Sequence, residues 1–401
     1  MRKAFVFALL ASGILWLVLA LFVPSSGQTK VWYLAGREYL SDYFMPRNTA
    51  AHANPYRDPA HTREFAYMRG GKAKEGPGWD LEERDRAYPA GALLPLLPFA
   101  ESLEGARMCN AVMIGFFLLV LAMCMRGARW LLFGALLLSG PMLFAYERGN
   151  PIWYAAAGTL VFLLYWDHPR RSVRWIAAAG LAVAASIKVM PAVLGVLYLG
   201  PILGTRERKA LIDPVVCVVL GLVAFVIPWF FVSGFESFGD WWRTGHENVA
   251  FYAPRTTFGF VGIYRTVMIA LCQAWEGTME FAVARWANVL CGFGALALAV
   301  REMPRSRYAG VLFATTGMLL VSSNMRPYTV LYLLPALLLW LDEKKVNLLP
   351  VEAIAWFVIW TPLQVPFCSL QLYPLQNIGL LVLCLCAICC DWRLVRNKRR
   401  S

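Results

Sequence analysis

Residues 1–23 read MRKAFVFALLASGILWLVLALFV, in which Arg2 and Lys3 precede an uncharged, largely apolar run from Ala4 to Val23. A helix that crosses a membrane needs about 20 predominantly apolar residues, and this run supplies them. A cleaved signal peptide would have a shorter apolar core, of about 7–15 residues, followed by a small-residue cleavage site. The sequence therefore favours a retained membrane span here, with cleavage as the alternative.

The rest of the chain repeats this apolar character. Of its 401 residues 59% are hydrophobic, and the mean hydropathy is +0.53, whereas soluble domains average about 45–50% apolar residues. Eleven further apolar runs follow the first, at 106–125, 130–146, 151–166, 175–189, 190–203, 211–232, 281–300, 308–322, 328–341, 346–363 and 374–390. We expect an all-α polytopic membrane protein with about 11–13 transmembrane helices.

Several of these runs are short, at 14–17 residues, and they pair around small polar stretches. This pattern is typical of helices that end inside the protein body, beside a cavity where backbone groups find partners. Residues 88–100 are apolar but too short to span and contain three prolines, which suits a re-entrant or interfacial segment.

The basic residues indicate the orientation. Of the 38 Lys and Arg residues, 20 fall in seven short breaks that lie on one side if the N-terminus is inside. By the positive-inside rule we expect both termini in the cytoplasm of an inner-membrane protein. The run 257–275 carries Arg265 near its middle, so we expect an outer-face helix there rather than a full span.

The expected organisation is one membrane domain over 1–401, with a long first external loop at 25–87 and a second external region at 233–280. The net charge of +13 is spread over the short breaks, so we interpret it as a topology signal and expect no nucleic-acid partner. The cysteines from Cys384 to Cys390 lie inside the apolar run 374–390, which contains no His or acidic partner. We interpret them as buried small hydrophobes, and we expect no metal site and no cofactor.

Polar residues that suit chemistry fall on the predicted outer face, where ionisable groups at membrane depth are costly and suggest function. In the first loop, Asp42 lies 19 residues beyond the first span; it is a candidate general base for a hydroxyl acceptor, or else a solvated aspartate or helix N-cap. Asn54-Pro55-Tyr56 has the composition of a turn, and Tyr88-Pro89 opens the short apolar segment.

Three basic residues come from separate predicted hairpins: Arg148, Lys188 and Arg326. Each could extend its charged end to the lipid headgroups, but together they fit a phosphate site at the outer interface better. In the second external region, Trp241 and Trp242 are candidates for stacking on a sugar, or members of an interfacial aromatic belt. His246 and Glu247 in the same region are candidates for binding substrate polar groups.

The order of these motifs resembles glycosyltransferase family 87 of the GT-C superfamily, which uses polyprenyl-phosphate mannose. The resemblance runs from about residue 37 to 341, and each motif alone is short and only moderately specific. It rests on Asp42, Asn54-Pro55-Tyr56, Tyr88-Pro89, Arg148-Gly149-Asn150, Ile187-Lys188 with Pro191, and the polar stretch from Ser323 to Tyr332. Many members have Gly-Gln in place of Gly149-Asn150, and many have a His in the late polar stretch, where this chain has none.

The resemblance implies a GT-C-like helical bundle and an inverting transfer of a hexosyl, for example mannosyl, unit. The donor would be a polyprenyl-phosphate sugar, and the acceptor a hydroxyl of a lipid or glycan at the outer leaflet. Asp42 would be the base, and Lys188, Arg148 and Arg326 would bind the donor phosphate. The other expected substrate-binding residues are Asn150, Tyr56, Tyr88, His246, Glu247, Trp241, Trp242 and Tyr328.

Two alternatives stay open. A secondary transporter or flippase of a lipid-linked or anionic substrate would also use broken helices and buried basic residues, although the long first loop and the lack of a hydropathy repeat argue against it. A different GT-C enzyme, or a ligase using an undecaprenyl-linked glycan, is separated only weakly by the sequence.

Overall fold

A computed structural model of the chain describes residues 2–22, 88–100, 102–125, 130–205, 211–243, 259–271, 278–322, 327–343, 350–361 and 374–398. Every regular element in these ranges is a helix, and no strand occurs among them. The prediction of an all-α chain is confirmed for this part of the protein. The first external loop, Asp42 included, lies outside the described residues.

The chain divides into two compact units, and the boundary between them falls inside helix α8 (Gly140–Arg148). Unit 1 comprises 1–29, 128–142 and 254–401, and unit 2 comprises 30–127 and 143–253.

Unit 2 contains a group of helices from the middle of the chain. These are α5 (Ala90–Leu93), η2 (Leu94–Leu96), α6 (Leu103–Cys124), α9 (Ile152–Tyr165), α10 (Arg171–Ile187), η3 (Met190–Tyr198), α11 (Leu199–Thr205) and α12 (Ile212–Val232). Residues 237–243 add a further helical segment after α12.

Unit 1 contains the first helix and the C-terminal helices. These are α1 (Arg2–Phe22), α7 (Trp130–Leu137), α14 (Gly259–Ala270), α15 (Met279–Glu302), α16 (Arg307–Val321), η6 (Pro327–Leu333), α17 (Leu334–Glu343), α18 (Pro350–Trp360) and α19 (Pro374–Lys398).

The helix boundaries follow from capping residues and prolines. Ser102, Thr278 and Ser306 precede α6, α15 and α16, and each accepts a hydrogen bond from a backbone N–H of the first turn, which satisfies a donor that the helix itself cannot. The predicted run 130–146 is split into α7, which ends at Leu137, and α8, which begins with Gly140 and Pro141. The segments that start at Met190 and at Pro327 are 3-10 helices rather than α-helices.

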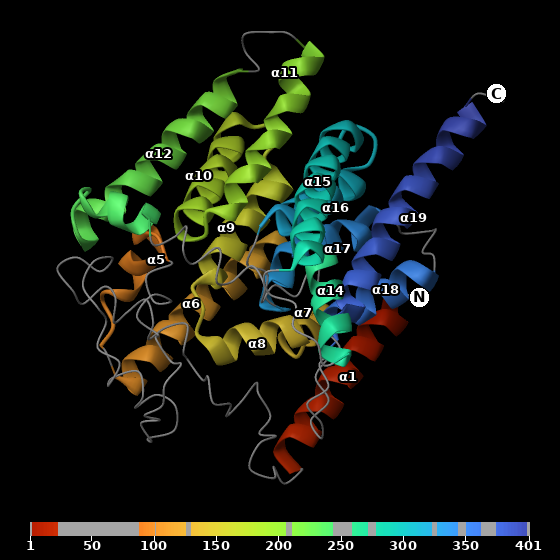
Figure 1. Ribbon diagram of the computed structural model, residues 1–401, viewed down its shortest axis with the longest axis horizontal. Coiled ribbons are helices and arrows are strands. Elements are labelled where there is room, and N and C mark those ends of the chain that lie inside the picture. Colours follow the sequence, from red (N-terminus) through yellow and green to blue (C-terminus); the bar gives the residue numbers. More distant parts are fainter. Residues whose placement is uncertain are drawn as a thin grey trace. The chain divides into compact units, whose positions relative to one another are not determined.

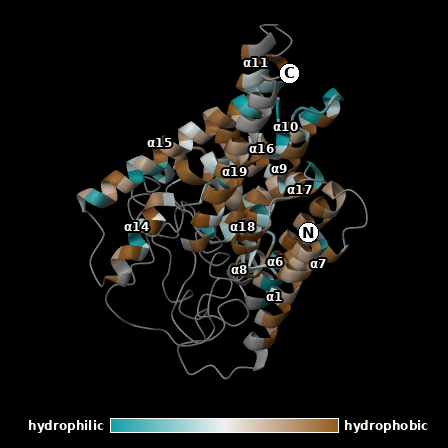
Figure 2. Cartoon of the chain, turned by 90° about the vertical axis from the view of Figure 1, so that its right-hand side faces the viewer, coloured by the Kyte–Doolittle hydropathy of each residue, from teal (hydrophilic) through white to brown (hydrophobic). Residues whose placement is uncertain are grey.

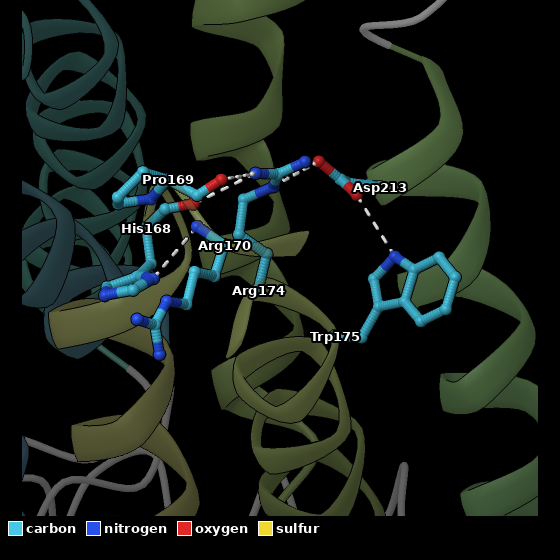
Figure 3. A network of polar contacts seen from close by, with 6 residues as sticks. All are labelled: His168, Pro169, Arg170, Arg174, Trp175 and Asp213. Atoms are coloured by element: carbon cyan, nitrogen blue, oxygen red, sulfur yellow. Dashed lines mark hydrogen bonds and ion pairs between the residues drawn. The ribbon is translucent and has the colours of Figure 1, made fainter. Parts of the chain in front are cut away.

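In unit 2, α9, α10 and α12 pack side by side, and α5 packs against α10 and α12 (Figure 1). Helices α9 and α10 approach closely because Gly158 and Gly180 face each other; a Cβ at Gly158 would clash with the carbonyl oxygen of Gly180. Helix α12 is tied to the start of α10 by an ion pair, in which Arg174 Nε donates to Asp213 Oδ2 at 2.7 Å (Figure 3).

In unit 1, α15 packs against α16 and α18 packs against α19. Glu343 at the end of α17 completes the start of α16: one carboxylate oxygen accepts from the Tyr308 backbone N–H at 2.9 Å, and the other accepts from Ser306 Oγ at 3.2 Å. Burial raises the pKa of Glu343, and these two hydrogen bonds lower it in part.

Among the described residues, three helical segments are long and apolar enough to cross a membrane: Glu104–Cys124, Ile212–Val232 and Met279–Glu302. Six shorter apolar helices of 10–17 residues accompany them, among them Ile152–Tyr165 and Arg307–Val321. Hydrophobic residues dominate most of the helical ribbon (Figure 2). These features are those of a helical membrane protein. The number of spans and the GT-C-like arrangement stay predictions.

Candidate functional site

The polar residues that the structure brings together lie in unit 2, at the end of α10. Helix α10 ends at Ile187, and Lys188 follows in an extended conformation, with Pro191 opening the next helical segment. Proline lacks an N–H and cannot continue the α-helical hydrogen-bond ladder. The Ile-Lys-x-x-Pro motif therefore places Lys188 at a helix break, and its side chain is half-buried.

The ammonium group of Lys188 lies over the ring of Tyr88. Its Nζ is 4.1 Å from the ring centroid, a distance at which the face of an aromatic ring attracts a cation. Tyr88 directly precedes Pro89, which is the N-cap residue of α5. The Tyr-Pro motif and the Ile-Lys-x-x-Pro motif, about 100 residues apart in sequence, thus meet in space.

Asn150 joins the same group from a third motif. Its Nδ2 donates to the hydroxyl of Tyr88 at 3.2 Å, and its Oδ1 accepts from the backbone N–H of Ile152 at 2.9 Å, at the start of α9. The side chain of Asn150 is fully buried. The preceding Gly149 has a φ of 62°, a left-handed conformation that suits glycine at a helix end.

A close backbone contact fixes α5 against the end of α10. A Cβ on Gly91 would clash with the backbone carbonyl of Ser186, two residues before Lys188. Because α5 begins two residues after Tyr88, this contact sets the distance between Tyr88 and Lys188. Only glycine permits so close an approach at this point.

An aromatic cluster borders Tyr88 on another side. Its buried members are Ala90, Leu93, Trp229 and Trp241, and Tyr88, Phe225, Val232 and Phe238 pack against them. Trp241 is only 7% exposed and its ring centroid is 5.7 Å from that of Trp229, whereas the neighbouring Trp242 is 65% exposed. Of the two predicted stacking residues, only Trp242 presents substantial surface.

Two buried residues that support this site were not predicted from the sequence. Asn110 of α6 donates to the backbone carbonyl of Tyr146 at 2.8 Å, near the end of α8 and two residues before Arg148. Trp229 lies in the core of the aromatic cluster. For Asn110, the sequence offers one indication, a polar residue inside the apolar run 106–125. For Trp229 it offers no indication, because a tryptophan does not stand out within an apolar run.

The other predicted site residues lie either in unit 1 or outside the described side chains. Arg148 is the last residue of α8, and its side chain is outside the description. Tyr328 lies in η6 of unit 1 and is 8% exposed. The residues that lie outside the described part of the chain are Asp42, Tyr56, His246, Glu247 and Arg326. Within the described part, no group of three or more His, Cys, Asp or Glu side chains could hold a metal ion.

The chain was compared with known families and proteins. No family model matches it, and neither a curated protein nor a solved structure matches significantly. The class that the fold defines is therefore a helical membrane protein, and its activity has to be argued from the site.

Proposed function

We propose that this protein is a membrane glycosyltransferase that transfers a hexosyl unit from a polyprenyl-phosphate donor to a hydroxyl of a lipid or glycan acceptor. The observation that carries the proposal is the meeting of Lys188, Tyr88 and Asn150. These residues come from three separate motifs whose order resembles that of glycosyltransferase family 87. Motifs that resemble those of a family by chance have no reason to converge on one place in the fold.

In the proposed reaction the acceptor oxygen attacks the anomeric carbon of the donor sugar from the face opposite the phosphate. The bond between that carbon and the phosphate oxygen breaks, and polyprenyl phosphate leaves with the bonding electrons. The acceptor hydroxyl loses its proton to the carboxylate of Asp42, the general base. The product has the inverted anomeric configuration, and no nucleotide takes part.

Lys188 has the role of holding the donor phosphate and stabilising the charge that develops as it leaves. Preorganised positive charge at a leaving group acts most strongly where water is excluded. The ring of Tyr88 orients the ammonium group without adding a negative charge of its own. Asn150 in turn fixes the hydroxyl of Tyr88, so Tyr88 and Asn150 act as positioning residues in this proposal. Arg148 and Arg326 are further candidates for phosphate binding.

The test is a transfer assay with the full chain in lipid nanodiscs. Radiolabelled polyprenyl-phosphate mannose, glucose and galactose are offered with membrane-lipid and glycan acceptors, and product is counted after extraction. We expect transfer from at least one donor, loss of transfer in Asp42→Asn, and a marked loss in Lys188→Gln. Full transfer by Asp42→Asn would remove Asp42 as the base.

A transporter gives a different result when the same protein is reconstituted in sealed vesicles. Absence of donor turnover, together with substrate-dependent uptake or lipid flipping in sealed vesicles, would replace the enzyme proposal by the transporter alternative. Arg243→Gln is the matched control for Lys188→Gln. Arg243 lies in unit 2, its side chain is 77% exposed, and it pairs with Asp240 at 3.7 Å, so its loss is expected to leave transfer unchanged.

A further inference from the structure

The start of α10, at the other end of the helix from Lys188, carries a second group of cations with a different chemistry. Arg170 is the N-cap residue of α10, Arg171 is its first residue, and Arg174 follows one turn later. The first turn contains no acidic residue, although the positive end of a helix dipole favours anions.

Arg174 is fully engaged within the fold. Besides its ion pair with Asp213, its Nη1 donates to the carbonyl oxygens of His168 at 2.9 Å and Pro169 at 3.2 Å (Figure 3). The second oxygen of Asp213 accepts from Trp175 Nε1 at 3.2 Å. Both oxygens of this carboxylate are therefore occupied by residues other than Arg170 and Arg171.

Arg170 and Arg171 are exposed. The side chain of Arg170 points away from Asp213 (Figure 3), and the guanidinium carbon of Arg171 lies 4.9 Å from the centroid of the Trp175 ring. Asp167 is the exposed acid of the same turn, so two exposed arginines outnumber it.

These cations lie at the end of an exposed apolar face. On α10 this face includes Trp175 at 40% exposure and Ile176 at 62%; on α12 it includes Ile212 at 40% and Val215 at 57%. In a membrane protein such a face contacts lipid acyl chains, and tryptophan beside arginine is typical of the headgroup level. The arrangement offers positive charge to a headgroup and apolar surface to the chains beneath it.

We propose that Arg170, Arg171 and Trp175 form a binding site for an anionic membrane phospholipid. The two guanidinium groups bind the headgroup phosphate, and the acyl chains lie along the exposed residues of α10 and α12. Charge complementarity selects an anionic over a zwitterionic headgroup. This site is independent of the proposed glycosyl transfer, since it involves none of the residues assigned to that reaction.

The test is native mass spectrometry of the detergent-solubilised full chain, titrated with phosphatidylglycerol or with phosphatidylcholine. We expect a phosphatidylglycerol adduct that forms at lower lipid concentration than the phosphatidylcholine adduct. Each arginine near an anionic lipid contributes about a 5-fold gain in affinity. Arg170→Gln or Arg171→Gln should each weaken the adduct about 5-fold, and the double variant about 30-fold.

Three controls make the outcome decisive. Arg243→Gln removes an exposed arginine elsewhere in unit 2 and should leave the adduct unchanged. Equal phosphatidylglycerol binding by the double variant and the wild type would overturn the proposal, as would loss of the adduct in Lys188→Gln alone. Displacement by millimolar inorganic phosphate would show a site for a soluble anion and would also overturn it. If the double variant does not fold, phosphatidylglycerol binding by each single variant is compared with that of the wild type.

Discussion

The two ends of α10 use their cations in opposite ways. At the start, Arg174 is paired with a carboxylate and two carbonyl oxygens. At the end, Lys188 lies over the ring of Tyr88, whose face attracts the ammonium group through its quadrupole. Arginine suits the first place because its planar guanidinium donates to several acceptors at once, whereas lysine is a compact point charge.

The length of α10 explains why the two ends face different surroundings. Its 17 residues span about 25 Å at 1.5 Å per residue, which approaches the thickness of the hydrocarbon core of a bilayer. Both cations flank the same apolar helix. The kind of charged group and the partner that it contacts therefore distinguish a structural cation from a cation that could bind a ligand.

The largest expected effect is on activity, from Lys188→Gln. Removing one preorganised group that stabilises developing charge typically lowers the rate about 100-fold or more. We expect a loss of that order in the initial rate of transfer, with the thermal midpoint within about 2 °C of wild type, because Lys188 is half-buried rather than fully buried. An unchanged rate with a lowered midpoint would assign Lys188 the structural role that the comparison gives to Arg174.

Gly91→Ala should disturb the Lys188 end through the backbone. Its Cβ would clash with the carbonyl of Ser186, and such overpacking costs about 1–3 kcal/mol. We expect a lower thermal midpoint in nanodiscs and weaker donor binding, because Tyr88 shifts away from Lys188. Gly115→Ala in α6 is the matched control: a Cβ there meets nothing within 4 Å, so stability should stay the same or rise slightly.

Arg174→Gln should reduce stability without affecting transfer. Its side chain and that of Asp213 are 24% and 19% exposed, so solvent screens the pair in part, and we expect a loss of about 1–2 kcal/mol. The measurement is the thermal midpoint beside the rate per folded molecule. Arg301→Gln is the control, since Arg301 is 58% exposed and its partner Glu302 also pairs with Arg305. A lower rate per folded molecule with an unchanged thermal midpoint would contradict a purely structural role for Arg174.

The smallest expected effect comes from Tyr88→Phe. The ring under Lys188 is kept, and only the hydroxyl that accepts from Asn150 is lost, at a cost of about 0.5–1.5 kcal/mol. We expect donor affinity to fall about 2- to 5-fold, measured by binding of radiolabelled polyprenyl phosphate. Tyr88→Leu removes the ring as well and should weaken binding further. Equal losses for the two variants would mean that the ring face contributes nothing.

Several features of the fold followed from the sequence. The apolar runs predicted helices, and the structure has a helix within each run that it describes. Prolines predicted breaks, and the run 257–275 contains a helix, α14; its location at the outer face stays a prediction. The split of 130–146 into two helices was not predicted, because Gly140 and Pro141 interrupt a run that is apolar on both sides.

The candidate site was predicted less completely. Tyr88, Asn150 and Lys188 were each predicted from motifs to bind substrate, which stays a prediction, and their mutual contacts were not predicted. Trp241 was identified by its aromatic character, yet it is buried among other aromatic residues. Exposure of a side chain depends on neighbours that come from elsewhere in the sequence, so composition alone did not distinguish Trp241 from Trp242.

A helical membrane protein with cations at the ends of apolar segments can be predicted from the sequence alone, because hydrophobicity and helical hydrogen bonding act over short stretches of chain. The contact of Lys188 with the ring of Tyr88 and that of Arg174 with Asp213 become visible only in the folded chain. Such contacts join residues separated by about 40 to 100 positions. They are set by how closely the helices pack, as at Gly91 and Ser186, and packing between distant segments leaves little trace in local sequence.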